Sequence, residues 1–299
     1  LLAAGQVGPM ILVFPGISSD NNAVSGMLTN FKSPELTTAA GIGNGKFKDY
    51  FLNDVIPYVD ANYRTVANKS GRGVDGFSLG GYMAVKIAAQ HPELFRTVGA
   101  FDGTHFFSRV SCQEIDPVDQ TFLNAMFDPV FGNPRDYAYG ALNNGPSLVC
   151  NSTPDAMKSM RWFIQHGPAT GEPNDANFLR GDHLIQKLTE KGVVNELPAV
   201  LEGGHNWETA DEHMRQSLPL HWSVLAPVEM GAITRAESGH LTLQGTGVPS
   251  AEHSIDASSD LAESFQPLAT VLADANGKLV FKDEDAPNHA RRFYRFSRP

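Results

Sequence analysis

The chain has 299 residues, of which 41% are hydrophobic and 19% are charged, and its formal net charge is −10. These values are typical of a globular protein with one large domain, or with a domain of about 220 residues and a smaller one. No apolar stretch reaches the roughly eighteen residues of a membrane span. The acidic balance, without any run of Lys and Arg, argues against nucleic acid or an anionic membrane as a partner.

Strand and helix patterns alternate along the first part of the chain. The continuous apolar run Met10–Phe14 is typical of a strand buried on both faces of a parallel sheet. A polar loop is predicted over residues 18–46, and apolar residues every four positions from Phe47 to Val59 then predict an amphipathic helix. The next predicted strand, 73–77, leads through a tight turn into a helix that ends before His91-Pro92.

The alternation continues to about residue 226 and is interrupted by one irregular segment. Residues 104–160 show no clean period, contain many turn-forming residues and hold both cysteines, so we expect an inserted cap or lid. Asp182 is predicted to cap a helix that stops at Gly192. Further strands are predicted at 97–101, 161–165 and 199–201, and a final helix at about 211–225.

Strands that alternate with helices predict an α/β domain over residues 1–226, with a parallel sheet covered by helices on both faces. After Pro227 the pattern changes to short β-type runs separated by Gly, Asn, Asp and Ser turns, without a helical period. Residues 227–299 are therefore predicted to form a separate, small, all-β module. Its predicted strands lie at 241–243, 270–272, 278–281 and 292–296.

The turn after strand 73–77 has the pattern Gly-x-Ser-x-Gly, with Ser78 at its centre. Such a turn strains the serine backbone, and we expect Gly76 and Gly80 to stand where a side chain would collide with a neighbour. The amino terminus of the following helix favours developing negative charge beside the hydroxyl. A chain with 28 glycines produces this pattern by chance, but strand, turn and helix occur here in the required order. Ser78 is therefore predicted to be a nucleophile.

A serine hydroxyl needs a base to accept its proton and a carboxylate to orient that base. His205 is the predicted base, because it follows Gly203-Gly204 on the loop after the last predicted strand. Asp175 and Asp182 are both candidates for the carboxylate, and Asp175 is favoured because a capping role already explains Asp182. The order serine, aspartate, histidine is that of the α/β-hydrolases.

The oxyanion of the tetrahedral intermediate needs backbone N–H donors. Leu79, the residue after the nucleophile, is predicted to supply one of them. The second donor is expected on a loop after an earlier strand.

The two cysteines, Cys112 and Cys150, are too few for a disulfide scaffold or a cysteine-rich zinc site. They form either one disulfide that staples the cap or two unpaired buried thiols. Four of the histidines, His166, His183, His213 and His221, show no spacing that would build a metal site. No metal or organic cofactor is expected.

Motifs beyond the serine turn support the same interpretation. They are Phe47–Tyr50, Ile56–Asp60, Asn62–Arg64, Gly76–Gly81, His91–Phe95 and Gly203–Trp207. Together they resemble the esterase D type putative-esterase family, which includes feruloyl and acetylxylan esterases, S-formylglutathione hydrolases and enterochelin esterases. The resemblance covers residues 1 to about 225 and implies an α/β-hydrolase fold.

Carried over position by position, the resemblance implies Ser78 as the nucleophile, Asp175 as the acid and His205 as the base. Within the family, the chain is most similar to the feruloyl esterase domains of xylan-degrading bacteria. Trp207 is expected either to border the acyl pocket, as a substrate-binding residue, or to serve in packing.

The resemblance also implies a departure at the start of the chain. Met10–Gly16 aligns with the family strand that follows the oxyanion-loop strand, so the first strands of the sheet are expected upstream of Leu1 and the sheet is expected to lack them. In the alternative alignment, Met10–Phe14 is the oxyanion strand itself, and Gly16 or Ile17 supplies the second donor. No signal peptide can be read before Leu1.

The hypothesis from sequence is a secreted bacterial serine carboxylesterase, extracellular or periplasmic, that hydrolyses feruloyl or acetyl esters of plant cell-wall polysaccharide. Its partner is a small-molecule or polysaccharide-linked ester, with no nucleic acid and no membrane. The C-terminal module resembles small β modules of secreted bacterial proteins, which favours export. The alternatives are an S-formylglutathione or siderophore-type esterase with the same triad, and a hydrolase-fold binding protein that has lost catalysis.

Overall fold

The computed structural model describes residues 1–169, 176–225, 228–248 and 250–297. The chain divides into two compact units, Leu1–Leu225 and Ala226–Pro299. Among the described residues, no helix combines the length and the apolar character that crossing a bilayer requires.

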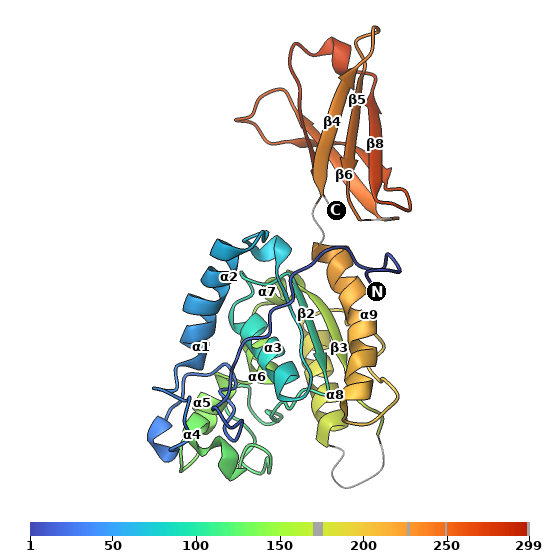
Figure 1. Ribbon diagram of the computed structural model, residues 1–299. Coiled ribbons are helices and arrows are strands. Elements are labelled where there is room, and N and C mark those ends of the chain that lie inside the picture. Colours follow the sequence, from blue (N-terminus) through green and yellow to red (C-terminus); the bar gives the residue numbers. More distant parts are fainter. Residues whose placement is uncertain (170–175, 226–227, 249, 298–299) are drawn as a thin grey trace. The chain divides into compact units, whose positions relative to one another are not determined.

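The first unit is built on a parallel sheet of three strands in the order β1-β2-β3 (Figure 1). β1 (Gly73–Val74) pairs with β2 (Thr97–Phe101), and β2 pairs along its whole length with β3 (Arg161–Gln165). Two isolated parallel bridges, Phe77 to Phe101 and His166 to Val200, extend the pairing beyond the ends of the strands. The predicted strand 199–201 is thus reduced to the single bridge at Val200.

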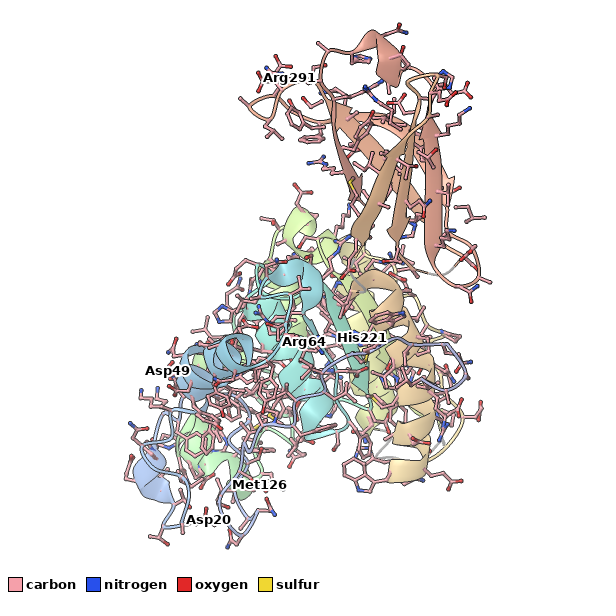
Figure 2. The ribbon with its side chains drawn as sticks, turned by 45° about the horizontal axis from the view of Figure 1, so that its top comes forward. Asp20, Asp49, Arg64, Met126, His221 and Arg291 are labelled. Carbon is pink, nitrogen blue, oxygen red and sulfur yellow. A yellow bond between two sulfur atoms is a disulfide. The ribbon has the colours of Figure 1, made fainter. Side chains whose placement is uncertain are left out.

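Helices cover both faces of this sheet, as the sequence predicts. On one face lie α3 (Leu79–Gln90), α6 (Gly145–Asn151) and α8 (Ala176–Glu190), and on the other lies α9 (Trp207–Leu225). His221 of α9 lies against the sheet, where its ring meets Phe163 edge-on (Figure 2). The predicted α/β architecture is confirmed.

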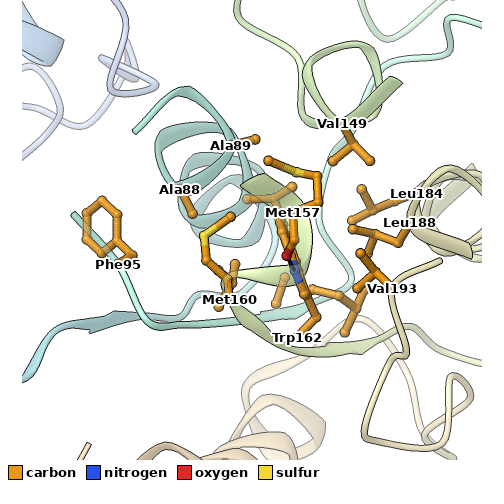
Figure 3. Close-up of a cluster of buried hydrophobic side chains, with 14 of the residues drawn as sticks. Ala88, Ala89, Phe95, Val149, Met157, Met160, Trp162, Leu184, Leu188 and Val193 are labelled. Atoms are coloured by element: carbon orange, nitrogen blue, oxygen red, sulfur yellow. Dashed lines mark hydrogen bonds between the residues drawn. The ribbon is translucent and has the colours of Figure 1, made fainter. Parts of the chain in front are cut away.

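The main core lies between the sheet and α3, α6 and α8. Because successive side chains of a strand point to opposite faces, Trp162 and Ile164 enter this core while Phe163 faces α9. Leu184 and Leu188 of α8 pack against Trp162 (Figure 3). These side chains are at most 1% exposed, so the sheet that carries the serine turn has a tightly packed base.

Before the sheet, an almost continuous helix covers the predicted amphipathic stretch. It consists of α1 (Phe47–Tyr50), a π-helical turn η2 (Phe51–Val55) and α2 (Ile56–Asn62), and Pro57 lies directly after the π-helical turn. The loop before it contains one short 3₁₀ turn, η1 (Pro34–Leu36), and another turn, η3 (Lys69–Gly71), precedes β1.

Two predictions about this unit are wrong. Met10–Phe14 is not a strand, and its apolar side chains are exposed, Phe14 by 85%. An apolar run becomes a buried strand only when a neighbour accepts its hydrogen bonds, and in the described residues β1 pairs with β2 alone. Asp182 lies inside α8 rather than at its cap, because the helix already begins at Ala176.

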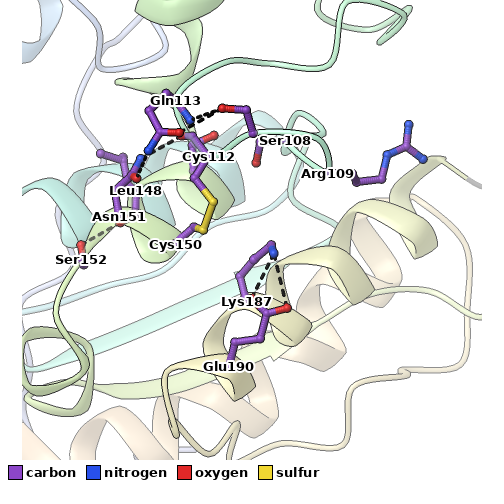
Figure 4. The surroundings of a disulfide bond; sticks show 12 residues. Ser108, Arg109, Cys112, Gln113, Leu148, Cys150, Asn151, Ser152, Lys187 and Glu190 are labelled. Atoms are coloured by element: carbon purple, nitrogen blue, oxygen red, sulfur yellow. Dashed lines mark hydrogen bonds and ion pairs between the residues drawn. A yellow bond between two sulfur atoms is a disulfide. The ribbon is translucent and has the colours of Figure 1, made fainter.

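Residues 104–160, predicted as a cap or lid, contain short helices and irregular loops. Cys112 and Cys150 form a disulfide across a Cα–Cα distance of 5.9 Å, which resolves the alternative left open by the sequence (Figure 4). A buried ion pair between Arg180 and Asp119 joins this segment to α8. Its helices are η4 (Ala125–Phe127), α4 (Asp128–Phe131), α5 (Tyr137–Ala141), α6 and α7 (Pro154–Lys158).

The second unit consists of two antiparallel sheets, ordered β4-β5-β8 and β7-β6-β9. β4 and β6 are absent from the sequence prediction. β6 carries His253, Ile255 and Asp256, all buried, so polar residues interrupt the apolar run that the prediction relied on. The strands are β4 (Glu229–Arg235), β5 (Leu241–Thr246), β6 (Glu252–Ser258), β7 (Gln266–Leu272), β8 (Lys278–Asp283) and β9 (Phe293–Ser297), with a 3₁₀ turn η5 (Ala286–Asn288).

Candidate active site

Ser78 occupies the sharp turn between β1 and α3. Its backbone lies at φ 57° and ψ −121°, with the positive φ that is uncommon for a residue with a side chain. The Ser78 N–H donates to Phe101 O on β2 (3.0 Å), and the Thr104 N–H donates to Ser78 O (3.2 Å). The strained turn that the sequence predicts is therefore present, and hydrogen bonds hold it from both sides.

The two glycines of the turn differ in the reason for their presence. A Cβ at Gly76 would lie 2.3 Å from the carbonyl carbon of Gly80, so a side chain cannot be accommodated. A Cβ at Gly80 would meet nothing within 4 Å. The expectation of a collision is thus right for Gly76 and wrong for Gly80, whose α-carbon faces open space.

His205 is carried on the tight loop that leads into α9. Gly203 has a φ of +140°, and a Cβ there would lie 2.3 Å from Thr209 Oγ1 in the first turn of α9. The chain can pass this close to the helix only with glycine at that position. Because α9 begins at Trp207, two residues after His205, the helix fixes where the imidazole stands.

The structure brings Ser78 and His205 together, although 127 positions separate them in the sequence. His205 Nε2 lies 2.9 Å from Ser78 Oγ, which is within hydrogen-bond distance. The imidazole rests on the ring of Phe77, with the ring centroids 4.6 Å apart. The histidine side chain is 42% exposed, so a substrate can reach the nitrogen that faces the serine.

The other imidazole nitrogen faces a carboxylate that sequence reasoning missed. His205 Nδ1 lies 3.1 Å from Oδ2 of Asp102, which follows β2 directly and is 3% exposed. The sequence places Asp102 directly after the predicted strand 97–101, but it does not show that this strand lies beside the serine turn. The predicted acid, Asp175, lies outside the described residues.

Leu79 is the first residue of α3. Its N–H belongs to the first turn of the helix and has no acceptor within it, as an oxyanion donor requires. The Leu79 and Ile17 side chains pack against the same cluster of buried aromatic residues around Phe106. Gly16 and Ile17 stay predictions as sources of the second donor, although the strand predicted before them does not form.

Trp207 lies at the rim of this arrangement and is 79% exposed. Its ring meets Phe77 edge-on, with centroids 5.1 Å apart, and Phe77 in turn contacts His205. A side chain with most of its surface in solvent contributes little to the core. The role of Trp207 in substrate binding stays a prediction.

A second carboxylate lies beneath the site, between the sheet and α9. Asp75 accepts hydrogen bonds from Ser217 Oγ (2.7 Å), and its oxygens lie 3.1 Å from His213 Nε2 and 3.2 Å from His221 Nε2. Burial by itself would raise the pKa of Asp75, but attraction and hydrogen bonding by the two histidines hold it well below its usual range. This cluster joins three positions of α9 to the strand that precedes Ser78.

Comparison with known proteins identifies the family of the chain. The family model described as putative esterase matches residues 2–220. Esterase Rv1288 and Esterase MT1326, from two strains of Mycobacterium tuberculosis, are each 29% identical to this chain over 219 residues, covering 68% of this chain and 43% of the relative. The chain therefore spans less than half the length of these relatives.

A shorter match concerns the endo-1,4-beta-xylanase/feruloyl esterase of Xylanibacter ruminicola, which is 29% identical over 104 residues, 34% of this chain and 12% of that protein. Among solved structures, a ferulic acid esterase superposes with a TM-score of 0.54 at 20% identity, covering 75% of this chain and 74% of its own. That likeness concerns the fold. The chain belongs to the putative esterase family and has the α/β-hydrolase fold.

Proposed function

We propose that this chain is a serine carboxylesterase in which Ser78 is the nucleophile and His205 the base. The observation that carries the proposal is the 2.9 Å separation between Ser78 Oγ and His205 Nε2 at the amino terminus of α3. A hydroxyl is a weak nucleophile at neutral pH, and a neighbouring imidazole at this distance can remove its proton as it attacks.

In the proposed reaction, Ser78 Oγ attacks the ester carbonyl carbon while His205 Nε2 accepts the hydroxyl proton. The Leu79 N–H donates to the oxyanion that forms. His205 then returns the proton to the oxygen of the departing alcohol, which leaves an acyl-serine. A water molecule, activated by the same nitrogen, releases the carboxylic acid and restores Ser78. Asp175 stays the carboxylate proposed from the order of the sequence.

We propose feruloyl esters of plant cell-wall polysaccharide as the first substrate class and acetyl esters as the second. The exposed ring of Trp207, next to Phe77 and His205, supports an aromatic acyl group because such rings stack on or edge against another ring. The relative named as a xylanase and feruloyl esterase supports the same class. The Cys112–Cys150 disulfide supports an exported protein, since disulfides persist in oxidising compartments.

Hydrolysis of methyl ferulate, acetylated xylan and S-formylglutathione by the wild-type chain and by Ser78→Ala tests the proposal. We expect turnover of methyl ferulate by the wild type and a loss of about 10⁴-fold or more in the variant. A fluorophosphonate probe should label the wild type and leave Ser78→Ala unlabelled. Near-complete activity in Ser78→Ala would refute the assignment, and preferential turnover of S-formylglutathione would replace the substrate class while keeping the nucleophile.

A further inference from the structure

We infer that Asp102, at the end of the central strand β2, is a positioning carboxylate for His205. The inference rests on the proposed ester hydrolysis and adds one residue to it. Asp102 Oδ2 lies 3.1 Å from His205 Nδ1, and His205 Nε2 lies 2.9 Å from Ser78 Oγ. The imidazole therefore bridges a carboxylate and a hydroxyl, which is the order that proton transfer requires.

The hydrogen positions follow from the donors and acceptors around the ring. For the Ser78 hydroxyl to donate to Nε2, a neutral His205 must carry its own hydrogen on Nδ1. Asp102 can receive this hydrogen, because a carboxylate only accepts. The amide nitrogen of Asn177, 2.9 Å from the same Nδ1, is a donor and cannot receive it. Asn177 can share the hydrogen only by turning its amide oxygen toward the ring.

Hydrogen bonds fix the position of Asp102, so its carboxylate can orient the imidazole of His205. Its Oδ1 accepts a hydrogen bond from the Gly167 N–H (2.7 Å), which leaves Oδ2 for His205. Its own N–H donates to Gln165 O at the end of β3 (3.0 Å), so the backbone and the side chain of Asp102 are both bonded to the segment at the end of β3. Its backbone has a φ of 47°, a left-handed conformation of the kind that concentrates at functional sites.

The burial of Asp102 adds an electrostatic consequence. When His205 accepts the serine proton it becomes an imidazolium, and the carboxylate stands next to the nitrogen that does not face the substrate. With a side chain that is only 3% exposed, Asp102 is poorly screened by solvent. Its negative charge is therefore placed to stabilise the charged imidazole in the transition state.

The test compares Asp102→Asn with the wild type, with Asp175→Asn, and with Asp116→Asn as a matched control. Asp116 is also a buried, hydrogen-bonded aspartate, but its partners are Arg109 and nearby backbone amides. We expect kcat for methyl ferulate to fall by about 10³- to 10⁴-fold in Asp102→Asn, with KM nearly unchanged, and to stay near wild type in Asp116→Asn. Thermal unfolding checks that each variant folds.

The pH dependence of fluorophosphonate labelling separates orientation from a structural defect. Removing the anion disfavours the imidazolium, so half-maximal labelling of Asp102→Asn should move to lower pH, a shift that Asp116→Asn should not show. A kcat for folded Asp102→Asn within tenfold of wild type would overturn the inference, whatever Asp175→Asn does. If Ser78→Ala also retained activity, the proposed function itself would fail.

A second measurement does not depend on the folding of Asp102→Asn. Histidine labelled with ¹⁵N allows the Nδ1 proton of His205 to be followed by NMR in the wild type and in Asp175→Asn. If Asp102 holds this proton, its low-field signal persists in Asp175→Asn. Loss of the signal in that variant would assign the proton to Asp175 and overturn the inference.

Discussion

Two clusters of serine, histidine and aspartate lie in the same domain, and their members are arranged in opposite orders. At the surface, the imidazole of His205 stands between Ser78 and Asp102. Below it, the carboxylate of Asp75 stands at the centre and receives Ser217 together with His213 and His221. The first order places a base next to the hydroxyl, and the second places the hydroxyl next to an anion.

The difference shows that residue types alone do not define a catalytic site. Ser217 and His213 are at most 1% exposed, so no substrate reaches them, whereas the His205 side chain is 42% exposed. The outer cluster can pass a proton between an alcohol and an imidazole. The inner cluster ties α9 to the sheet through a buried ionised carboxylate, and we expect its contribution to be to stability.

Replacing His205 and His213 by glutamine, one at a time, should separate the roles of the two clusters most clearly. His205→Gln should lower kcat about 10⁴-fold and leave the thermal midpoint within a few degrees, because the side chain is partly exposed. His213→Gln should leave kcat nearly unchanged and should lower the free energy of unfolding by about 2–3 kcal/mol. Steady-state kinetics and urea unfolding of both variants check this prediction. An equal loss of kcat in the two variants would mean that both clusters contribute to turnover.

Asp75→Asn should lower the free energy of unfolding by about 3 kcal/mol or more, because it leaves buried histidines without their anion. Urea unfolding at neutral pH measures the effect. The control is Asp211→Asn, which removes an exposed carboxylate paired with Arg215 on the same helix and should cost less than about 1 kcal/mol. Similar losses in the two variants would contradict a special role for Asp75.

The wild type and Asp75→Asn should also differ in how their stability depends on pH. The pKa of Asp75 is lowered in the folded state, so its stabilisation is complete above the unfolded pKa of about 4 and is lost as the pH falls below it. The difference in unfolding free energy between wild type and Asp75→Asn should therefore shrink as the pH falls from about 5 to about 3. A difference that grows over this range would reverse the sign of this argument.

The smallest expected effect concerns Trp207 at the rim of the outer cluster. Trp207→Ala should lower kcat/KM for methyl ferulate about fivefold, in line with about 1 kcal/mol for a lost aromatic contact, and should change kcat/KM for an acetyl ester much less. The thermal midpoint should stay unchanged because the ring is 79% exposed. An equal loss on both esters would mean that Trp207 acts on His205 rather than on the acyl group.

Much of the fold could be predicted because local patterns and tertiary packing agree. The buried strands Thr97–Phe101 and Arg161–Gln165 are short apolar runs between turns. The Gly-x-Ser-x-Gly pattern around Ser78 indicates a sharp turn between a strand and a helix. Met10–Phe14 has the same apolar character and yet is no strand. The composition of a segment indicates its preference for strand conformation. A strand also needs a neighbouring strand as its hydrogen-bond partner, and composition does not show whether one is present.

The candidate site was predicted in part for the same reason. Ser78 and His205 each follow two residues after a glycine at which a side chain would collide, Gly76 and Gly203, so their positions could be found. Asp102 has no such marker, because an aspartate after a strand is also an ordinary turn residue. Its contact with His205 depends on the pairing of β2 with its neighbours, and no pattern in the sequence specifies that pairing.

The cross-link between Cys112 and Cys150 has a practical consequence for substrate profiling. Both half-cystines are partly accessible, and the bond closes a segment with a sequence separation of 38. Thioester cleavage liberates a thiol, and thiolates attack disulfides. The thiol that a thioester substrate releases can therefore reduce the Cys112–Cys150 disulfide. Assays with such substrates should include a thiol trap, and reducing agents should be left out of the storage buffer.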